Sequence, residues 1–194
     1  MGLQPVSELE TRLKGIVSRS AWFMAALAAA RDLELPVWCI GAGALRNVVW
    51  DTLHDLAEPS SLSDIDLAWF DASDLSRQRD LELQSRLTPQ SIAPWEVTNQ
   101  AGVHLWFESY FGYAVAPLRS LDQAVASWPE YATSVGVWLD KNDGLHVIAP
   151  HGLGDLFDLV VRRNPTRIDV ATYRRRVAQK SYTARWPQIR IVEE

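Results

Sequence analysis

The sequence has 194 residues, of which 47% are hydrophobic, and a formal net charge of −5. This length fits one domain, and the apolar fraction is large enough for a core, which excludes a disordered chain. The acidic balance argues against a default nucleic-acid binder, because such proteins carry a basic surface. Cys39 is the single cysteine and cannot form an internal disulfide, so a reducing compartment is expected.

No apolar run of the sequence approaches the roughly 20 residues that a membrane-spanning helix needs. The first residues also lack the charged, apolar and cleavage regions of a secretory signal. We therefore expect a cytoplasmic protein.

Two helices are predicted in the first 31 residues. Ser7 and Glu10 have the spacing of a capping box, and apolar residues then recur at helical intervals over 7–17. Ser20 is placed to cap a second, alanine-rich helix over residues 21–31. Residues 1–19 are interpreted as an N-terminal helical extension.

The central segment of the chain is residues 37–67. An apolar strand over 37–40 is predicted to enter the glycine turn Gly41-Ala42-Gly43, which leads into an amphipathic helix over about 44–56. A linker of turn-forming residues then precedes a second strand over 64–70. The pattern is strand, turn, helix, loop and strand.

The rest of the chain is predicted to mix short helices and strands. Ser73 or Asp74 begins a polar surface helix that Thr88-Pro89 is expected to end. Further elements are predicted as a strand at 94–98, helices at about 101–110, 120–128, 154–161 and 169–180, and a hairpin within 133–149 whose turn is Lys141-Asn142-Asp143-Gly144. The arginines near the C-terminus are interpreted as a solvated helix face.

The second strand carries two carboxylates, Asp64 and Asp66. Strand side chains alternate, so these two share one face while Ile65 and Leu67 share the other. Two like charges on a mostly buried strand are costly without compensation, and a hard cation with oxygen ligands is the usual remedy. In the alternative interpretation Asp64 caps the start of the strand and Asp66 is merely exposed.

The glycine turn is a candidate phosphate site. Gly41 and Gly43 let the backbone approach a ligand closely, and the helix that follows presents free N–H groups. Arg46 could donate to the same anion. The alternatives are an ordinary turn with Arg46 in solvent, or a dinucleotide fingerprint with Asp64 as its acid. The same-face acid pair and the lack of further βαβ units argue against the fingerprint.

A third acid, Glu96, lies on the strand predicted at 94–98. If that strand pairs beside 64–70, Glu96 could complete a three-carboxylate site for Mg²⁺ and substrate phosphates. The alternative is an exposed strand glutamate. Asn99, Gln100 and His104 follow and could line a substrate pocket, although a lone histidine is more often part of a core.

This ordered series resembles the polymerase-β-like nucleotidyltransferase superfamily, and more narrowly a group of small uncharacterised bacterial nucleotidyltransferase family proteins. The resemblance covers roughly residues 20–190. The matching stretches are Gly43-Ala44-Leu45-Arg46-Asn47, Trp50-Asp51, Ser63-Asp64-Ile65-Asp66, Phe70-Asp71, Trp95-Glu96-Val97, Asn99-Gln100-Ala101, Val103-His104, Trp128-Pro129-Glu130, Ala132-Thr133, Ala149-Pro150, Gly152-Leu153, Asp155-Leu156-Phe157, Lys180 and Trp186-Pro187. Gly102 and Gly154 depart from the pattern, which has arginine and aspartate there, and Ala42 replaces a second glycine or serine.

The resemblance implies an α+β fold with a mixed sheet flanked by helices. It implies one domain over 1–194, with residues 120–194 as a C-terminal elaboration. The implied activity is transfer of a nucleoside monophosphate from an NTP to an unknown acceptor by a two-metal mechanism. The implied catalytic metal ligands are Asp64 and Asp66, which would hold Mg²⁺ or Mn²⁺. The resemblance also implies that the third acid varies in this group, so Glu96 is a candidate third ligand from its strand position alone. Gly41, Gly43, Arg46 and Asn99 are the candidate nucleotide-binding residues.

The acceptor is expected to be a small molecule rather than a long nucleic acid, because the chain is acidic. The alternative function is a catalytically inactive nucleotide-binding or interaction protein on the same fold. Mg²⁺-dependent transfer of label from an α-labelled NTP would distinguish the two.

Overall fold

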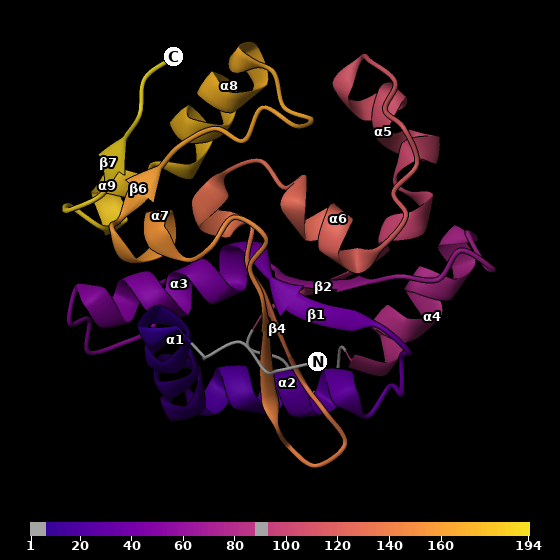
Figure 1. The fold of residues 1–194 in the computed structure, drawn as a ribbon, viewed down its shortest axis with the longest axis horizontal. Coiled ribbons are helices and arrows are strands. Elements are labelled where there is room, and N and C mark those ends of the chain that lie inside the picture. Colours follow the sequence, from indigo (N-terminus) through magenta and orange to yellow (C-terminus); the bar gives the residue numbers. More distant parts are fainter. Residues whose placement is uncertain (1–6, 88–92) are drawn as a thin grey trace.

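The computed structural model of the protein describes residues 7–87 and 93–194, and a five-stranded sheet lies at its centre (Figure 1). The strand order is β3-β2-β1-β4-β5. Strand β2 runs parallel to β3, and the other neighbours are antiparallel, so the sheet is mixed. The strands are β1 (Trp38–Gly41), β2 (Ile65–Trp69), β3 (Trp95–Asn99), β4 (Gly136–Leu139) and β5 (Leu145–Ile148). The expected α+β class is confirmed.

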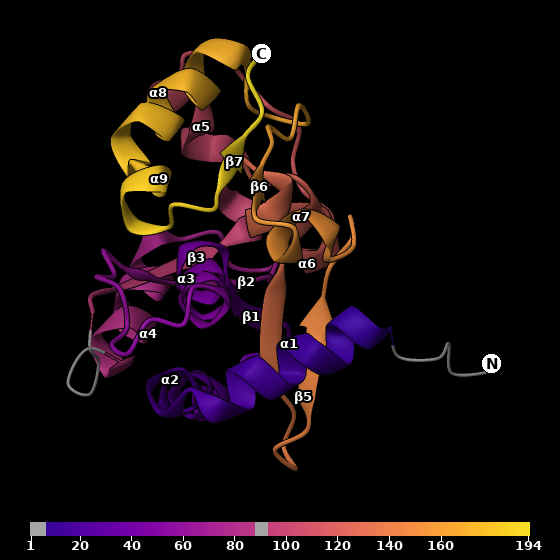
Figure 2. The ribbon, with the colours of Figure 1, turned by 90° about the vertical axis from the view of Figure 1, so that its left-hand side faces the viewer.

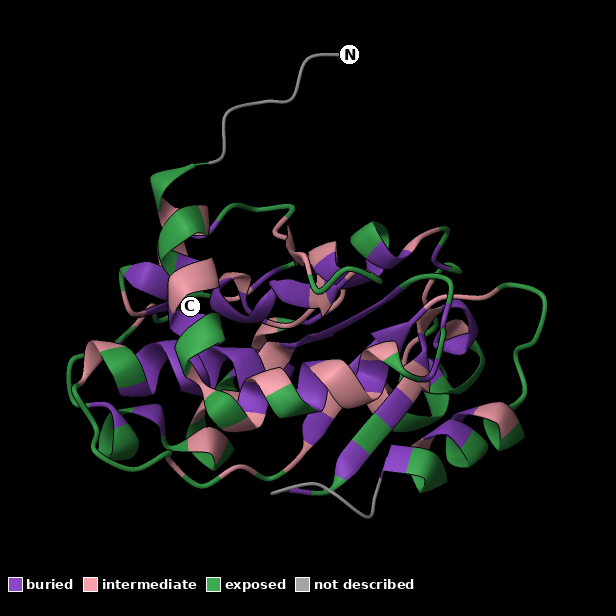
Figure 3. Cartoon of the chain, turned by 90° about the horizontal axis from the view of Figure 1, so that it is seen from below, coloured by how far each residue is buried: buried purple, intermediate pink, exposed green. Residues whose placement is uncertain are grey.

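Helices cover both faces of this sheet. Figure 2 shows α1 and α2 on one side and α6 to α9 on the other. The helices are α1 (Glu8–Arg19), α2 (Ala21–Arg31), α3 (Ala42–Leu53), α4 (Arg77–Leu87), α5 (His104–Phe111), α6 (Leu121–Ala126), α7 (Gly154–Phe157), α8 (Val170–Lys180) and α9 (Tyr182–Arg185). In Figure 3 buried and exposed residues alternate around the helices, as expected for elements with one face on a core.

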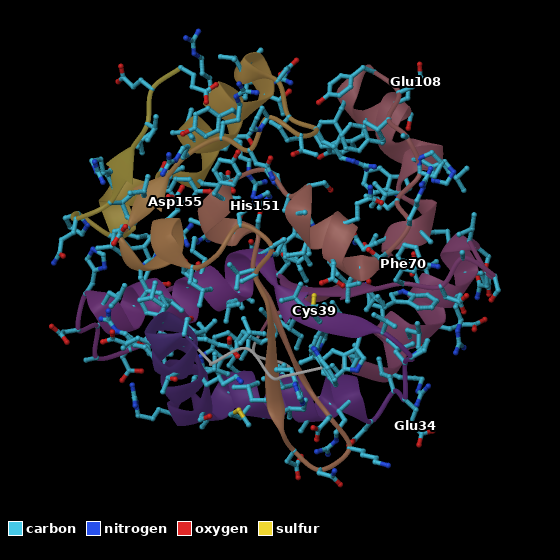
Figure 4. All side chains as sticks on the ribbon, viewed as in Figure 1. Glu34, Cys39, Phe70, Glu108, His151 and Asp155 are labelled. Carbon is cyan, nitrogen blue, oxygen red and sulfur yellow. The ribbon has the colours of Figure 1, made fainter. Side chains whose placement is uncertain are left out.

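The alternation of strand side chains divides the core into two clusters. Ile40, Leu67 and Val97 join the main core with apolar residues of α1, α2 and α3. Cys39 pairs with Ala68 across β1 and β2, and these two join a smaller cluster beneath α6. Figure 4 shows the Cys39 sulfur on this side of β1. The sheet therefore has a main-core face and an α6 face.

The helix predicted to begin at Ser7 and the helix predicted at 169–180 both start with a side-chain cap. The Ser7 hydroxyl accepts a hydrogen bond from the Glu10 N–H at 3.1 Å, and the Asp169 carboxylate accepts one from the Thr172 N–H at 2.7 Å. Ser20 occupies the N-cap position of α2, but its side chain makes no capping bond. Helix α2 is apolar enough to be held by burial, so it needs no side-chain cap.

The helix predicted over 154–161 is shorter than expected. Helix α7 ends at Phe157, Leu159 takes a left-handed backbone conformation with φ of 56°, and the chain continues as a strand. Strand β6 (Val160–Val161) pairs in parallel with β7 (Arg190–Ile191). The apolar residues that suggested helical periodicity are thus shared between a helical turn and a short strand.

The remaining helix boundaries differ from expectation by a few residues. Helix α3 begins two residues earlier than predicted, at Ala42, and ends at Leu53. Helix α4 begins at Arg77, and its predicted end at Thr88-Pro89 lies outside the described residues. Over residues 7–87 and 93–194, none of the helices combines the length and the apolar character needed to cross a membrane.

Candidate active site

The glycine turn after β1 is shaped by steric contacts. A Cβ atom on Gly41 would lie 2.5 Å from the Val135 carbonyl oxygen and 2.7 Å from the Trp128 ring, so only glycine fits there. A Cβ atom on Gly43 would approach only the Arg46 Nη2 atom, at 3.8 Å. The first glycine is therefore required by packing, whereas the second borders open space that a ligand could occupy.

Ala42, between these two glycines, has a left-handed backbone conformation with φ of 47°. This conformation costs a residue with a Cβ atom roughly 1 kcal/mol, and glycine adopts it freely. We therefore expect Ala42→Gly to raise the free energy of unfolding by about 0.5–1 kcal/mol. Urea denaturation measures this change, and an Ala29→Gly variant in the middle of α2 is the control because it should be destabilised. A loss of stability in Ala42→Gly would contradict the assignment of strain to this turn.

The predicted carboxylates lie on the α6 face of the sheet, next to the glycine turn. Asp64 immediately precedes β2 and Asp66 lies within it, and the parallel register pairs Asp66 with Glu96 on β3. Their neighbours Ile65 and Leu67 are buried on the opposite face. The two strands do pair, which was the condition for a role of Glu96, and the pairing brings Glu96 beside Asp66 on the edge strand, where Glu96 is exposed.

Asp66 is a carboxylate with a strongly perturbed pKa. Burial, together with the negative charges of Asp64 and Glu96, raises the pKa of Asp66 to about 7. The cations Arg176 and Lys180 act in the opposite direction. A carboxylate with like charges beside it and little solvent gains stability from a bound cation.

The acids share a face without being drawn into a closed cluster. Within residues 7–87 and 93–194, no three histidine, cysteine or acidic side chains are close enough together to hold one metal ion between them. Mg²⁺ is bound through one or two carboxylates plus water and substrate phosphates, rather than by a complete protein cage. The oxygen donors of Asp64 and Asp66, and the raised pKa of Asp66, fit such a partly protein-bound ion.

Arg46 lies inside the protein and not in solvent. Its side chain is buried, and its guanidinium packs over the rings of Trp50, Tyr182 and Trp186 at 5.1–5.4 Å. Its Nε and Nη2 atoms donate to the Asn47 side-chain oxygen at 3.2 and 2.7 Å. Burial lowers the pKa of Arg46. This position is at the base of the turn, where the charge of Arg46 can act on an anion bound at Gly43.

Asn99 also turns inward. Its side-chain oxygen accepts from the N–H groups of Asp71 and Ala101, and its nitrogen donates to the carbonyls of Asp71 and Asp74. These four hydrogen bonds use every donor and acceptor of the amide. As placed, Asn99 holds the loop after β2 and has no group left for a nucleotide. Gln100 donates to the Thr98 carbonyl at 3.4 Å, and the Nδ1 atom of His104 is buried without a hydrogen-bond partner in the described structure.

Helix α8 contributes two cations, Arg176 and Lys180, whose charges act on Asp66. Arg176 donates through Nε to Glu130 at 2.6 Å, and Glu130 is 1% exposed. Glu130 also accepts from the Tyr182 hydroxyl at 3.3 Å, and Arg46 Nη1 lies 3.5 Å from that hydroxyl. From the sequence, the arginines near the C-terminus are interpreted as a solvated helix face. That interpretation is wrong for Arg176, because Arg176 is paired with a buried glutamate.

Comparison with known proteins identifies the family. A family model described as Nucleotidyltransferase matches residues 28–191 of the sequence. The chain belongs to this nucleotidyltransferase family. Among curated proteins no sequence matches significantly.

Solved structures show the same fold. A protein described from its NMR structure as having a CCA-adding enzyme head domain is 28% identical, with a TM-score of 0.78 over 95% of this chain and 96% of that one. A CCA-adding enzyme in complex with CTP has a TM-score of 0.52 at 14% identity, over 98% of this chain and 44% of that enzyme. The Thermotoga maritima CCA-adding enzyme complexed with tRNA has a TM-score of 0.52 at 13% identity, over 93% and 42%. This nucleotidyltransferase spans less than half the length of those two enzymes.

The two departures from the nucleotidyltransferase pattern are sterically mild. A Cβ atom on Gly102 would make ordinary contacts with Leu75, the nearest at 3.6 Å, and a Cβ atom on Gly154 would meet nothing within 4 Å. Neither position excludes a side chain, so neither glycine is required by the fold.

Sequence reasoning missed how α3 positions the loop that leads to Asp64. The Asn47 amide donates to the Ser60 hydroxyl and the Ser61 carbonyl, and Asp51 accepts from the Ser60 N–H at 2.9 Å. The other Asp51 oxygen accepts from the Trp186 indole at 2.8 Å. The signal was present, since Asn47 and Asp51 are polar residues four positions apart on a mostly apolar helix.

Proposed function

We propose that this nucleotidyltransferase moves a nucleoside monophosphate from an NTP to an acceptor hydroxyl or phosphate, with a divalent cation bound by Asp64 and Asp66. The observation that carries the proposal is the position of Asp66 on β2, with Asp64 immediately before the strand, next to the glycine turn. Glu96 lies beside Asp66 in the register of β2 and β3, and it is proposed as a third ligand whose side chain turns toward the ion when the ion binds.

The residues around the acids have separate proposed roles. When bound, Mg²⁺ or Mn²⁺ supplies positive charge to the substrate phosphates and, in a two-metal arrangement, lowers the pKa of the attacking hydroxyl. Gly43 leaves open space beside the start of α3, where backbone N–H groups can donate to a phosphate. Arg46 adds a buried positive charge behind the turn. Holding the triphosphate in one orientation is the main contribution of such residues to phosphoryl transfer.

The proposal is tested by transfer of label from each α-labelled NTP in the presence of Mg²⁺ or Mn²⁺. Asp66→Asn keeps the shape of the side chain and removes its charge, so we expect at least an approximately hundredfold loss of transfer. The control is Asp158→Asn, an exposed aspartate far along the chain that should leave transfer unchanged. Equal transfer by wild type and Asp66→Asn would contradict the catalytic assignment.

A small molecule is the proposed acceptor, because the net charge of −5 opposes binding of a long nucleic acid. The same assay offers pools of small hydroxyl compounds in one series and RNA ends in another. Transfer to RNA alone would reject the small acceptor while leaving nucleotidyl transfer intact. NTP binding without transfer to either acceptor would instead support the inactive nucleotide-binding alternative.

A further inference from the structure

We propose that Lys180 and Arg176 of α8 bind the terminal phosphates of the NTP, with Lys180 as the residue that distinguishes a triphosphate from a monophosphate. This inference rests on the proposed function, because it concerns the same site. It adds to the glycine turn a second set of phosphate-binding groups, on an element more than a hundred residues later in the chain.

The orientation of α8 is fixed by its contacts with buried groups. Arg176 donates through Nε to Glu130 at 2.6 Å, and Glu130 in turn accepts from Tyr182 and Thr133 at 3.3 and 2.8 Å. Among the described residues Arg176 makes no other hydrogen bond, so its Nη atoms remain available for a ligand. Figure 2 shows α8 and α9 above α3, on the same side of the sheet as α6.

Lys180 lies four residues after Arg176, and residues at this spacing share one face of a helix. The Lys180 side chain is half-buried, and it forms no hydrogen bond or ion pair with another residue in the described parts of the chain. Burial lowers its pKa, as do the nearby cations Arg176 and Arg46, while Asp64 and Asp66 raise it. The ammonium group therefore interacts with both the acids and two other cations.

The arrangement of these positive charges favours the binding of an anion. Three positive charges, those of Arg46, Arg176 and Lys180, interact with one another across a largely buried region. A desolvated cation without a partner is unfavourable, and a phosphate oxygen would satisfy it. The alternative is that Lys180 only offsets the charge of Asp64 and Asp66. In that case its loss would change metal affinity but would not separate triphosphate from monophosphate.

The experiment compares Lys180→Met with Arg175→Met by calorimetric titration of NTP, NMP and inorganic pyrophosphate in Mg²⁺. Arg175 is a matched control because it lies on the same helix, is exposed and contacts Thr172 instead. We expect Lys180→Met to weaken NTP and pyrophosphate binding by about tenfold to a hundredfold, the value of one hydrogen bond to a charged group. NMP binding should change less than about twofold, and Arg175→Met should bind all three as the wild type does.

Equal affinity of wild type and Lys180→Met for NTP, or equal losses for NTP and NMP, would overturn the inference. Lys180-dependent NTP binding in a protein that transfers no label to any acceptor would support the inference and reject the proposed function. NTP binding that is independent of Lys180 would overturn the inference and leave the proposed function standing. If Lys180→Met does not fold by circular dichroism, Lys180→Gln replaces it, with the same expectations.

Discussion

In EDTA at pH 8, Asp66→Asn is expected to melt several degrees above the wild type. The folded-state pKa of Asp66 is raised to about 7, from an ordinary value of 3.8. The folded protein therefore holds this proton more tightly than the unfolded chain does, so stability falls as pH rises from about 4 to 7 and the full cost is present at pH 8. The difference corresponds to at most about 4 kcal/mol. Because Asp66 is partly exposed, we expect about 1–2 kcal/mol, or roughly 2–8 °C in melting temperature.

The response to metal shows whether the higher melting temperature of Asp66→Asn comes from removing the Asp66 charge or from an unrelated gain in stability. If the proposed function holds, millimolar Mg²⁺ or Mn²⁺ should bind only the folded wild type and raise its melting temperature by mass action. Asp66→Asn should lose most of that shift, and its advantage in EDTA should shrink as the pH is lowered toward 5. Asp158→Asn is the control, because it is exposed and should follow the wild type throughout. An identical metal response in Asp66→Asn and wild type would show that the paired aspartates do not bind the ion.

The central strand, turn and helix could be predicted because their signals are local. Alternation along the strand predicted at 64–70 identified the shared face of Asp64 and Asp66. The sequence left open whether the strand that carries Glu96 pairs beside it, and the parallel register of β2 and β3 supplies that pairing. The assignment of Asp64, Asp66 and Glu96 to a metal site stays a prediction, as does the assignment of residues 1–194 to one domain.

The orientation of the Arg46 and Asn99 side chains could not be predicted, because it depends on partners that are distant in the sequence. Arg46 packs against rings more than a hundred residues away, and Asn99 bonds to a loop after β2. Neither contact leaves a periodic trace in the sequence. Leu159 illustrates the same limit, since its left-handed conformation is stabilised where β7 pairs with the chain beside it.

The ion pair between Glu130 and Arg176 is another long-range feature. Its removal should change stability more than Asp66→Asn does. Glu130→Ala leaves the largely buried Arg176 guanidinium without its partner, which typically costs about 3–5 kcal/mol. It also removes the acceptor of the Tyr182 and Thr133 hydroxyls. For a protein of this size the melting temperature should fall by roughly 6–20 °C. Urea denaturation at neutral pH measures the free energy directly.

Two further variants determine whether the cost comes from the unpaired charge. Glu108→Ala removes an exposed glutamate on α5 (Figure 4), and it should change stability by no more than about 0.5 kcal/mol. Adding Arg176→Met to Glu130→Ala should recover part of the loss, because the double variant buries neither charge. A loss below about 1 kcal/mol in Glu130→Ala would indicate a solvated pair. In that case Glu130 would not fix the orientation of Arg176, and α8 would lack the buried contact that aims its cations at the carboxylates of β2.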